Sequence, residues 1–166
     1  NVRNIELGQP VPINIENGIA AMAMAQLAGC TAEELRVGML SFSGVDRRFD
    51  FKIKTPELVF LSDYAHHPKE IWQSASSIRQ LYQNRRITAI FQPHLYSRTR
   101  DFFPEFAKAL SLLDEVILTD IYPAREEPIE GVTSQLIYDR LAPGVEKQLI
   151  SKDDVIPLVK SRSFDV

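Results

Sequence analysis

The stretch that decides the fold reads ITAIFQPHLYSRTRDFFPEFAKAL and covers residues 87–110. Its first five residues, 87–91, form a short run of apolar character, which predicts a buried β-strand. From Phe102 onward, apolar side chains recur at helical spacing as far as Leu113, which predicts a helix with one buried face. A turn rich in histidine and arginine separates the two. Strand, polar turn and helix together are typical of one repeat of a parallel α/β fold.

The same alternation continues on both sides of this stretch. Further strands are predicted at residues 49–53, 58–61, 116–121 and 145–150, and further helices at residues 68–82, 134–141 and 154–160. The first two strands flank Thr55-Pro56-Glu57, which suits a hairpin or another tight connection. The later strands do not alternate and are separated by helices, which predicts a Rossmann-like, mostly parallel sheet with helices on both faces. Residues 164–166 read as the start of one more strand, cut short.

The first forty residues follow a different pattern, that of two helices. Asn14 is a good N-cap for a first helix that ends before Gly29, and small apolar residues lie on nearly all its sides, which predicts burial all round. Cys30, the single cysteine, is expected to be a buried, inert thiol. Thr31 and Glu34 have the spacing of a capping box, so a second helix should begin there. We expect a linker at residues 41–44, which divides the chain into a segment 1–43 and a domain 44–166.

Composition excludes several classes of protein. The 166 residues carry a net charge of −3, which argues against a protein that coats nucleic acid, and one cysteine cannot form an internal disulfide. No apolar stretch approaches the roughly 20 residues of a membrane span. The chain opens on Asn without a signal-peptide pattern, which hints at a fragment.

Polar turns follow three of the predicted strands, at residues 62–68, 92–100 and 122–127. The carboxyl ends of parallel strands share one edge of the sheet, and ligands bind in the crevice there. We therefore expect the histidine, tyrosine and arginine side chains of these turns to meet at one rim.

Simpler interpretations of these residues remain open. His66 and His67 could simply cap a helix. They should not bind one metal ion together, because adjacent side chains in an extended chain point apart, and Cys30 lies in a different element, so we expect no metal site. Arg98 and Arg100 could be solvated, although two cations at a helix N-terminus would favour an anionic partner. Glu126 and Glu127 read as an exposed acidic loop.

The sequence lacks the common phosphate-binding motifs of nucleotide-binding proteins. Neither a G-x-x-x-x-G-K-[ST] phosphate loop nor a G-x-G-x-x-G fingerprint occurs in the sequence. We infer that this chain does not hold nucleotide phosphates by itself.

Five segments, taken in order, resemble the Mur ligase family, and in particular its alanine-adding members. They are NIENGIAAMAMA (14–25), FSGVDRRF (42–49), SDYAHHPKEI (62–71), FQPHLYSRTRDFF (91–103) and DIYPAREEPIEG (120–131). The resemblance implies that residues 44–166 are the C-terminal domain of a three-domain ligase, truncated before its last strand. It implies that residues 1–43 end the central ATP-binding domain.

The activity that this resemblance implies is the ATP-dependent joining of L-alanine to UDP-N-acetylmuramate through an acyl phosphate, in peptidoglycan precursor synthesis. It implies a cytoplasmic enzyme with ATP and Mg²⁺ bound mainly by the central domain, and no nucleic-acid or membrane partner. The fragment alone should be inactive.

The resemblance also implies site residues. Asn17, Arg48 and Asp63 would contact the nucleotide. Tyr64, His66, His94 and Arg98 would line the L-alanine site, with His66 as the catalytic residue that keeps the amine unprotonated. Arg98 would bind the carboxylate, since its fork can hold two oxygens.

Two positions depart from the family pattern: Leu95 stands where an arginine is usual, and Ile13 where a histidine is usual. Alanine binding would then depend more on Arg98 or Arg100. Three rival functions remain: a murein-peptide recycling ligase, a non-catalytic nucleotide-responsive binding module and, most distantly, a metal-dependent hydrolase.

Overall fold

A computed structural model describes residues 4–7 and 12–166, with side chains from residue 14 in the second range. The chain divides into two compact units, Asn1–Asp50 and Phe51–Val166. Each unit is described by itself below. No helix in the described part of the chain is long and apolar enough to cross a membrane.

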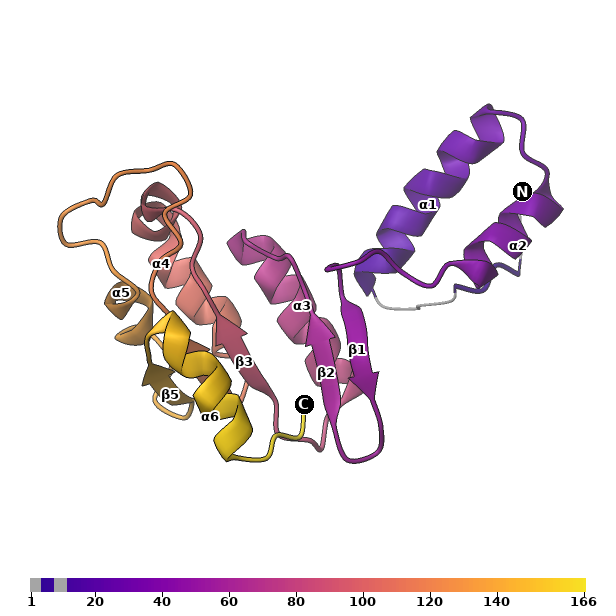
Figure 1. The fold of residues 1–166 in the computed structure, drawn as a ribbon. Helices are drawn as coiled ribbons and strands as arrows, with labels where there is room; N and C mark the ends of the chain where they lie inside the picture. The colour runs from indigo at the N-terminus through magenta and orange to yellow at the C-terminus, as the bar shows by residue number, and fades with distance from the viewer. Residues whose placement is uncertain (1–3, 8–11) are drawn as a thin grey trace. The chain divides into compact units, whose positions relative to one another are not determined.

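The first unit contains two helices, α1 (Pro12–Leu27) and α2 (Ala32–Ser41) (Figure 1). The helix α1 begins two residues before Asn14, so the prediction that Asn14 caps it is wrong; proline is well suited to a first turn because its missing N–H would be unpaired there. The predicted capping box of α2 is confirmed. The backbone N–H of Thr31 donates to Glu34 at 2.8 Å, and the backbone N–H of Glu34 donates to Thr31 Oγ1 at 3.3 Å.

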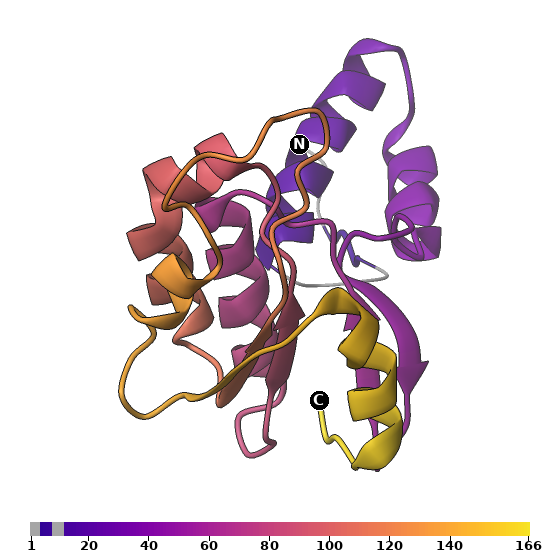
Figure 2. The same cartoon turned by 60° about the vertical axis from the view of Figure 1, so that its left-hand side comes forward.

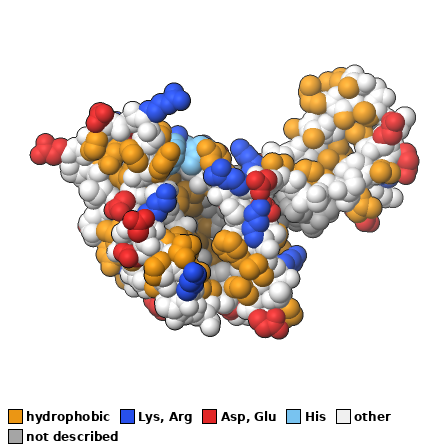
Figure 3. Space-filling model, in the orientation of Figure 1, with side chains coloured by type: hydrophobic (Ala, Val, Ile, Leu, Met, Phe, Trp, Pro, Cys, Tyr) orange, Lys and Arg blue, Asp and Glu red, His pale blue; other side chains and the backbone are white. Residues whose placement is uncertain are grey.

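The expected burial of the first helix and of Cys30 is not observed within this unit. Ile19, Met24 and Leu27 of α1 are 59%, 68% and 83% exposed, and Cys30 is exposed in the turn that follows. Hydrophobic side chains accordingly lie at the surface of this unit (Figure 3). The reason is geometric: a single partner helix can cover only one side of α1, and no described element of the unit covers its other sides.

The second unit is the predicted α/β fold. Its strands are β1 (Asp50–Lys54), β2 (Val59–Ser62), β3 (Thr88–Phe91), β4 (Glu115–Leu118) and β5 (Glu146–Leu149). Its helices are α3 (Pro68–Leu81), α4 (Tyr96–Leu110), α5 (Gln135–Tyr138) and α6 (Val155–Ser161), the last preceded by a 3₁₀ turn at Lys152–Asp154. The strands β3, β4 and β5 form a parallel sheet in that order, and β1 pairs with β2 in a separate two-stranded sheet. The Thr55 N–H donates to the Leu58 carbonyl at 2.9 Å and closes the predicted tight connection.

Helices cover both faces of the parallel sheet. In two views, α3, α4 and α5 lie on one face and α6 lies on the other (Figures 1 and 2). The main core lies under α4, where Phe106 is fully buried together with Val116 and Leu118 of β4. All four residues of β4 are buried, as a central parallel strand requires.

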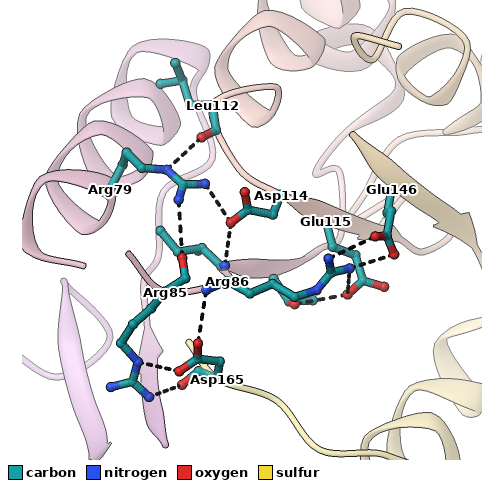
Figure 4. A network of polar contacts seen from close by, with 10 residues as sticks. Arg79, Arg85, Arg86, Leu112, Asp114, Glu115, Glu146 and Asp165 are labelled. Carbon is teal, nitrogen blue, oxygen red and sulfur yellow. Dashed lines mark hydrogen bonds and ion pairs between the residues drawn. The ribbon is translucent and has the colours of Figure 1, made fainter. Parts of the chain in front are cut away.

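A polar network joins the amino ends of the strands (Figure 4). Glu115, only 2% exposed, accepts from Arg162 at 2.7 Å and from Arg86 at 3.4 Å, and Arg86 also binds Glu146. These cations explain why β4 begins on a buried glutamate rather than at Val116, because a buried carboxylate is tolerated only when it is paired. The network therefore fixes the edge of the sheet opposite to the polar turns.

The same edge holds the C-terminal residues. Asp165 forms an ion pair with Arg85, its carbonyl accepts from the Val59 N–H at 2.9 Å, and the Val166 carbonyl accepts from the Thr88 N–H at 2.8 Å. Residues 165–166 thus occupy the place of a strand between β2 and β3. Beyond them, a largely apolar cavity of about 510 Å³ lies between these two strands.

Candidate functional site

Side chains from the turns after β2 and β3 meet at the carboxyl edge of the strands. The rings of Tyr64 and His66 lie 5.3 Å apart between centroids, and the rings of His66 and His94 lie 6.3 Å apart. Arg98 Nη1 lies 3.3 Å from His94 Nδ1 and 3.4 Å from the His66 carbonyl oxygen. The structure therefore brings together the four residues that the sequence suggested for an amino-acid site.

The turn after β4 reaches the same place. Tyr122 forms an isolated parallel bridge with His94, and the two rings stack with centroids 5.4 Å apart. The Leu95 N–H donates to the Tyr122 carbonyl at 2.9 Å. Three strand-end turns thus share one rim, and histidine side chains reach the surface there (pale blue in Figure 3).

The two adjacent histidines have different roles. His67 is the N-cap of α3, and its Nδ1 accepts from the Lys69 N–H at 3.4 Å, which is the simple capping role considered for the pair. His66 turns toward the site instead, with its Nδ1 3.0 Å from the Tyr64 carbonyl oxygen and 3.5 Å from a carboxylate oxygen of Glu70. The same Glu70 oxygen accepts the backbone N–H groups of His66 and His67 at 3.0 and 3.1 Å. Glu70 therefore fixes both the start of α3 and the His66 ring.

His94 lies in an environment that disfavours its charged form. Burial is the main cause that lowers the pKa of His94, and the positive charge of Arg98 and the nearby His66 lower it further. The negative charge of Glu126 acts in the opposite direction and is the weakest of these effects. His94 is consequently neutral near pH 7.

Arg98 and Arg100 lie on different sides of α4. Residues two apart on a helix are separated by about 200° around its axis, so the two guanidinium groups point apart. Arg98 faces the two histidines, and its Nε and Nη2 groups make no hydrogen bond within the described residues. Arg100 is half exposed and pairs with Asp101 at 2.7 Å. Of the two, Arg98 is the one available to an anion at the shared rim.

Glu126 corrects the interpretation of residues 126–127 as an exposed acidic loop. It is only partly exposed, and its carboxylate accepts the Ser97 N–H at 2.9 Å and the Ser97 hydroxyl at 2.5 Å. These bonds with Ser97 lower the pKa of Glu126. The N-cap position of α4, Leu95, has φ of 73° and makes no side-chain capping bond, so Glu126 supplies the anion that this helix N-terminus favours.

Of the residues proposed for nucleotide contact, Asp63 lies in the turn after β2, and Asn17 and Arg48 lie in the first unit. The Asp63 carboxylate is occupied by the Ala65 N–H at 3.0 Å and by the Ser74 hydroxyl, so it stabilises the turn before α3. Asn17 is exposed on α1, and Arg48 is exposed in a turn in which its N–H donates to the Val45 carbonyl. The side chain of Ile13 lies outside those described.

Histidine, cysteine and acidic side chains are the groups of this chain that could hold a metal ion. Among the residues that the structure describes, no group of three or more histidine, cysteine or acidic side chains could hold one. His66 and His67 point to different partners, as expected for adjacent residues.

Three site residues were missed by the sequence interpretation: Glu70, Tyr122 and Glu126. Glu70 had a usable signal, because it stands three residues after the N-cap, where a capping box places its acid. Tyr122 and Glu126 stand just after a strand, but nothing local indicates that they contact His94 and Ser97, which are 28 and 29 residues away.

The sequence matches the Mur ligase, glutamate ligase domain family over residues 47–161. It is 63% identical over its whole length to a UDP-N-acetylmuramate–L-alanine ligase of Phocaeicola vulgatus and 53% identical over 99% of its length to one of Parabacteroides distasonis. The chain spans 36% of the length of each of these relatives.

Solved structures show the same fold. The UDP-N-acetylmuramate–alanine ligase of Thermotoga maritima superimposes with a TM-score of 0.77 at 30% identity, over 97% of this chain and 34% of that one. A murein peptide ligase of Psychrobacter arcticus gives a TM-score of 0.66 at 20% identity, over 97% and 34%, which supports the fold alone.

Proposed function

Because this chain belongs to the Mur ligase family, through its glutamate ligase domain, we propose that it is the amino-acid-binding part of an ATP-dependent ligase that joins L-alanine to UDP-N-acetylmuramate. The observation that carries this proposal is the meeting of Tyr64, His66, His94 and Arg98 at one rim. The names of the alanine-ligase relatives support the choice of amino acid.

The cluster has the polar groups that a small zwitterion requires. The guanidinium of Arg98 offers a fork of N–H donors to the carboxylate of L-alanine. His66 offers a ring nitrogen toward the ammonium group, and Tyr64 and His94 border the space between them. The half-exposed Tyr64 would close over the small side chain of the amino acid.

The reaction proceeds in two steps. ATP transfers its γ-phosphoryl group to the UDP-N-acetylmuramate carboxylate, which gives ADP and an acyl phosphate. The neutral amine of L-alanine then attacks the acyl carbon: a C–N bond forms and the C–O bond to phosphate breaks. The departing phosphate takes the proton that the nitrogen loses and leaves as hydrogen phosphate. This chain contributes to the second step, because it holds the amine in position and unprotonated.

Nucleotide binding is proposed to depend mainly on residues outside this chain, since it has no phosphate loop. ATP requires a divalent cation, for which Mg²⁺ is proposed, to neutralise charge on the transferred phosphoryl group. We propose that Asn17 contacts the adenine and that Arg48 and Asp63 approach the ribose or phosphates. Asp63 would have to release the Ser74 hydroxyl to do so.

We propose that residues 1–43 belong to the end of the central ATP-binding domain and that residues 44–166 form the C-terminal domain. The compact unit that starts at Phe51 and the family match from residue 47 support a boundary in this region. The proposed setting is the cytoplasm, with small-molecule substrates. The chain by itself is expected to be inactive.

The experiment that tests the proposal measures phosphate release by the full-length ligase. Release should require ATP, UDP-N-acetylmuramate and L-alanine together, and omission of any one should reduce it to background. Release with a tripeptide in place of L-alanine would favour a murein-peptide ligase. Nucleotide binding without any turnover would favour a non-catalytic binding module.

A further inference from the structure

We propose that His66 and His94 present opposite tautomers to the site, so that His66 Nε2 accepts the proton of the substrate ammonium group while His94 Nε2–H donates to its carboxylate. In this arrangement Glu70 is a positioning residue, which holds the His66 ring through Nδ1. The assignment of roles to the two rings deepens the proposed function and rests on it. The tautomers themselves follow from contacts within the chain.

The tautomer of His94 follows from its contact with Arg98. A guanidinium group carries only N–H donors, so the His94 Nδ1 atom, 3.3 Å from Arg98 Nη1, must accept. A neutral imidazole that accepts through Nδ1 carries its proton on Nε2. The neutral state agrees with the lowered pKa of this ring. His94 therefore offers one N–H donor away from Arg98 and has no lone pair left for a proton.

The tautomer of His66 follows from the opposite kind of neighbour. Its Nδ1 lies 3.0 Å from the Tyr64 carbonyl oxygen and 3.5 Å from a Glu70 carboxylate oxygen. A carbonyl and a carboxylate can only accept, so Nδ1 must carry the proton. The lone pair of the neutral ring then lies on Nε2, on the side of the ring away from Glu70.

Two histidines with opposite tautomers give the site one acceptor and one donor. When an ammonium group binds, one of its protons passes to His66 Nε2, which leaves a neutral amine and an imidazolium. That imidazolium keeps its Nδ1–H toward Tyr64 O and is paired with the Glu70 carboxylate. His94 cannot take this role, because its Nδ1 is occupied by Arg98 and its Nε2 already carries a proton.

The test is long-range ¹H–¹⁵N NMR of the histidine rings in the 166-residue chain at neutral pH. The chain has only three histidines, and His66→Gln, His67→Gln and His94→Gln variants assign the three ring patterns. His67 is an internal reference, because its Nδ1 accepts the Lys69 N–H and its proton should therefore lie on Nε2. We expect His67 and His94 to show the Nε2–H pattern and His66 alone to show the Nδ1–H pattern.

Two variants test separately which contact sets the tautomer of each ring. Glu70→Gln keeps an oxygen for the backbone of α3 but removes the carboxylate, and it should weaken the preference of His66 for the Nδ1–H form without abolishing it, because the Tyr64 carbonyl still accepts from Nδ1. It should leave His94 unchanged. Arg98→Leu should mix the His94 tautomers and leave His66 in the Nδ1–H form. Backbone amide spectra report whether each variant folds, and the unsubstituted chain alone decides the assignment if a variant does not. An Nε2–H pattern for His66, or an Nδ1–H pattern for His94, overturns the proposal.

Kinetics of the full-length ligase test the catalytic role separately. His66→Gln should lower kcat by about 100-fold or more, the usual contribution of a general base, with a smaller change in the KM for L-alanine. Glu70→Gln should lower kcat less, again with little effect on KM. If the tautomers are as expected but the ligase never uses L-alanine, the proposed function fails and the tautomer assignment stands. If the ligase uses L-alanine but His66→Gln retains full kcat, the proton-accepting role of His66 fails.

Discussion

Replacement of Arg98 by alanine is the sharpest test of the proposed amino-acid site. The full-length ligase with Arg98→Ala should show a raised KM for L-alanine, because the substrate carboxylate loses the forked donor that Arg98 provides at the shared rim. The KM for ATP should change little, since Arg98 is not among the residues proposed for nucleotide contact. Initial rates of phosphate release at varied L-alanine, with ATP and UDP-N-acetylmuramate saturating, measure both constants.

The magnitude follows from the contacts that Arg98 makes. A hydrogen bond to a charged group contributes about 1.5–3 kcal/mol, and 1.4 kcal/mol corresponds to a factor of ten in affinity. The KM for L-alanine should therefore rise roughly 10- to 150-fold. The contacts of Arg98 within the chain, at 3.3 and 3.4 Å, are long, so loss of folding should contribute little. Arg98→Lys keeps the charge but not the fork and should give an intermediate increase.

Arg100→Ala is the matched control, since it removes the same side chain two residues away on the same helix. Arg100 pairs with Asp101 and points away from the histidines, so its loss should leave the KM for L-alanine within about twofold, the range expected of a surface substitution. An unchanged KM in Arg98→Ala would refute the proposed role of Arg98. A large increase in Arg100→Ala alone would move the carboxylate site to the other side of α4.

Three further changes test the fold and the support of the site. Phe106→Ala, at a fully buried position, should lower the free energy of unfolding by about 3–5 kcal/mol in urea titrations, whereas Ile156→Ala at a 60% exposed position should change it by less than about 0.5 kcal/mol. Glu126→Gln should raise the KM for L-alanine several-fold in the full-length ligase, because the Glu126 carboxylate accepts both the Ser97 N–H and the Ser97 hydroxyl and so holds the start of α4, which carries Arg98. An unchanged KM would show that this contact does not position Arg98. Burial alone would raise the pKa of Asp114, but the hydrogen bond from the Ile87 N–H and the ion pair with Arg79 outweigh it, so the pKa is lowered. The charged Asp114 therefore stabilises the fold above its ordinary pKa of about 4, and this stabilisation is lost as the pH falls through the lowered pKa. Asp114→Asn should therefore reduce the difference in unfolding free energy between pH 7 and pH 3, and an undiminished difference would contradict this assignment.

The elements of the second unit follow from local patterns in the sequence. Apolar runs mark the buried strands, and helical spacing marks α3 and α4, because side-chain periodicity depends only on backbone geometry. The capping box of α2 is equally local, since both of its partners lie within one turn. The edge shared by the turns after β3 and β4 follows from the parallel order of these strands, because their carboxyl ends then lie on the same side. The strand β2 pairs with β1 in a separate sheet, so only the structure places its turn at the same edge.

The local signals failed where burial depends on neighbours that the pattern does not specify. The apolar residues of α1 and Cys30 were expected inside, but the described part of their unit has only one helix to pack against them. Glu115 was not expected within a strand, and it is buried there because Arg86 and Arg162 approach from distant parts of the chain. A hydrophobic pattern indicates which face would be buried if a partner were present, and it does not supply the partner.

The sequence by itself determined the order of strands and helices, the polar turns and the kinds of side chain in them. Only the tertiary structure decided that His66 faces Glu70 and Tyr64 O, that Arg98 donates to His94, and that Glu126 holds Ser97. Such contacts depend on the register of strands and the rotation of helices, where a shift of one residue turns a side chain to the other face. For two histidines in one cluster, these neighbours decide which ring can accept a proton and which can only donate one.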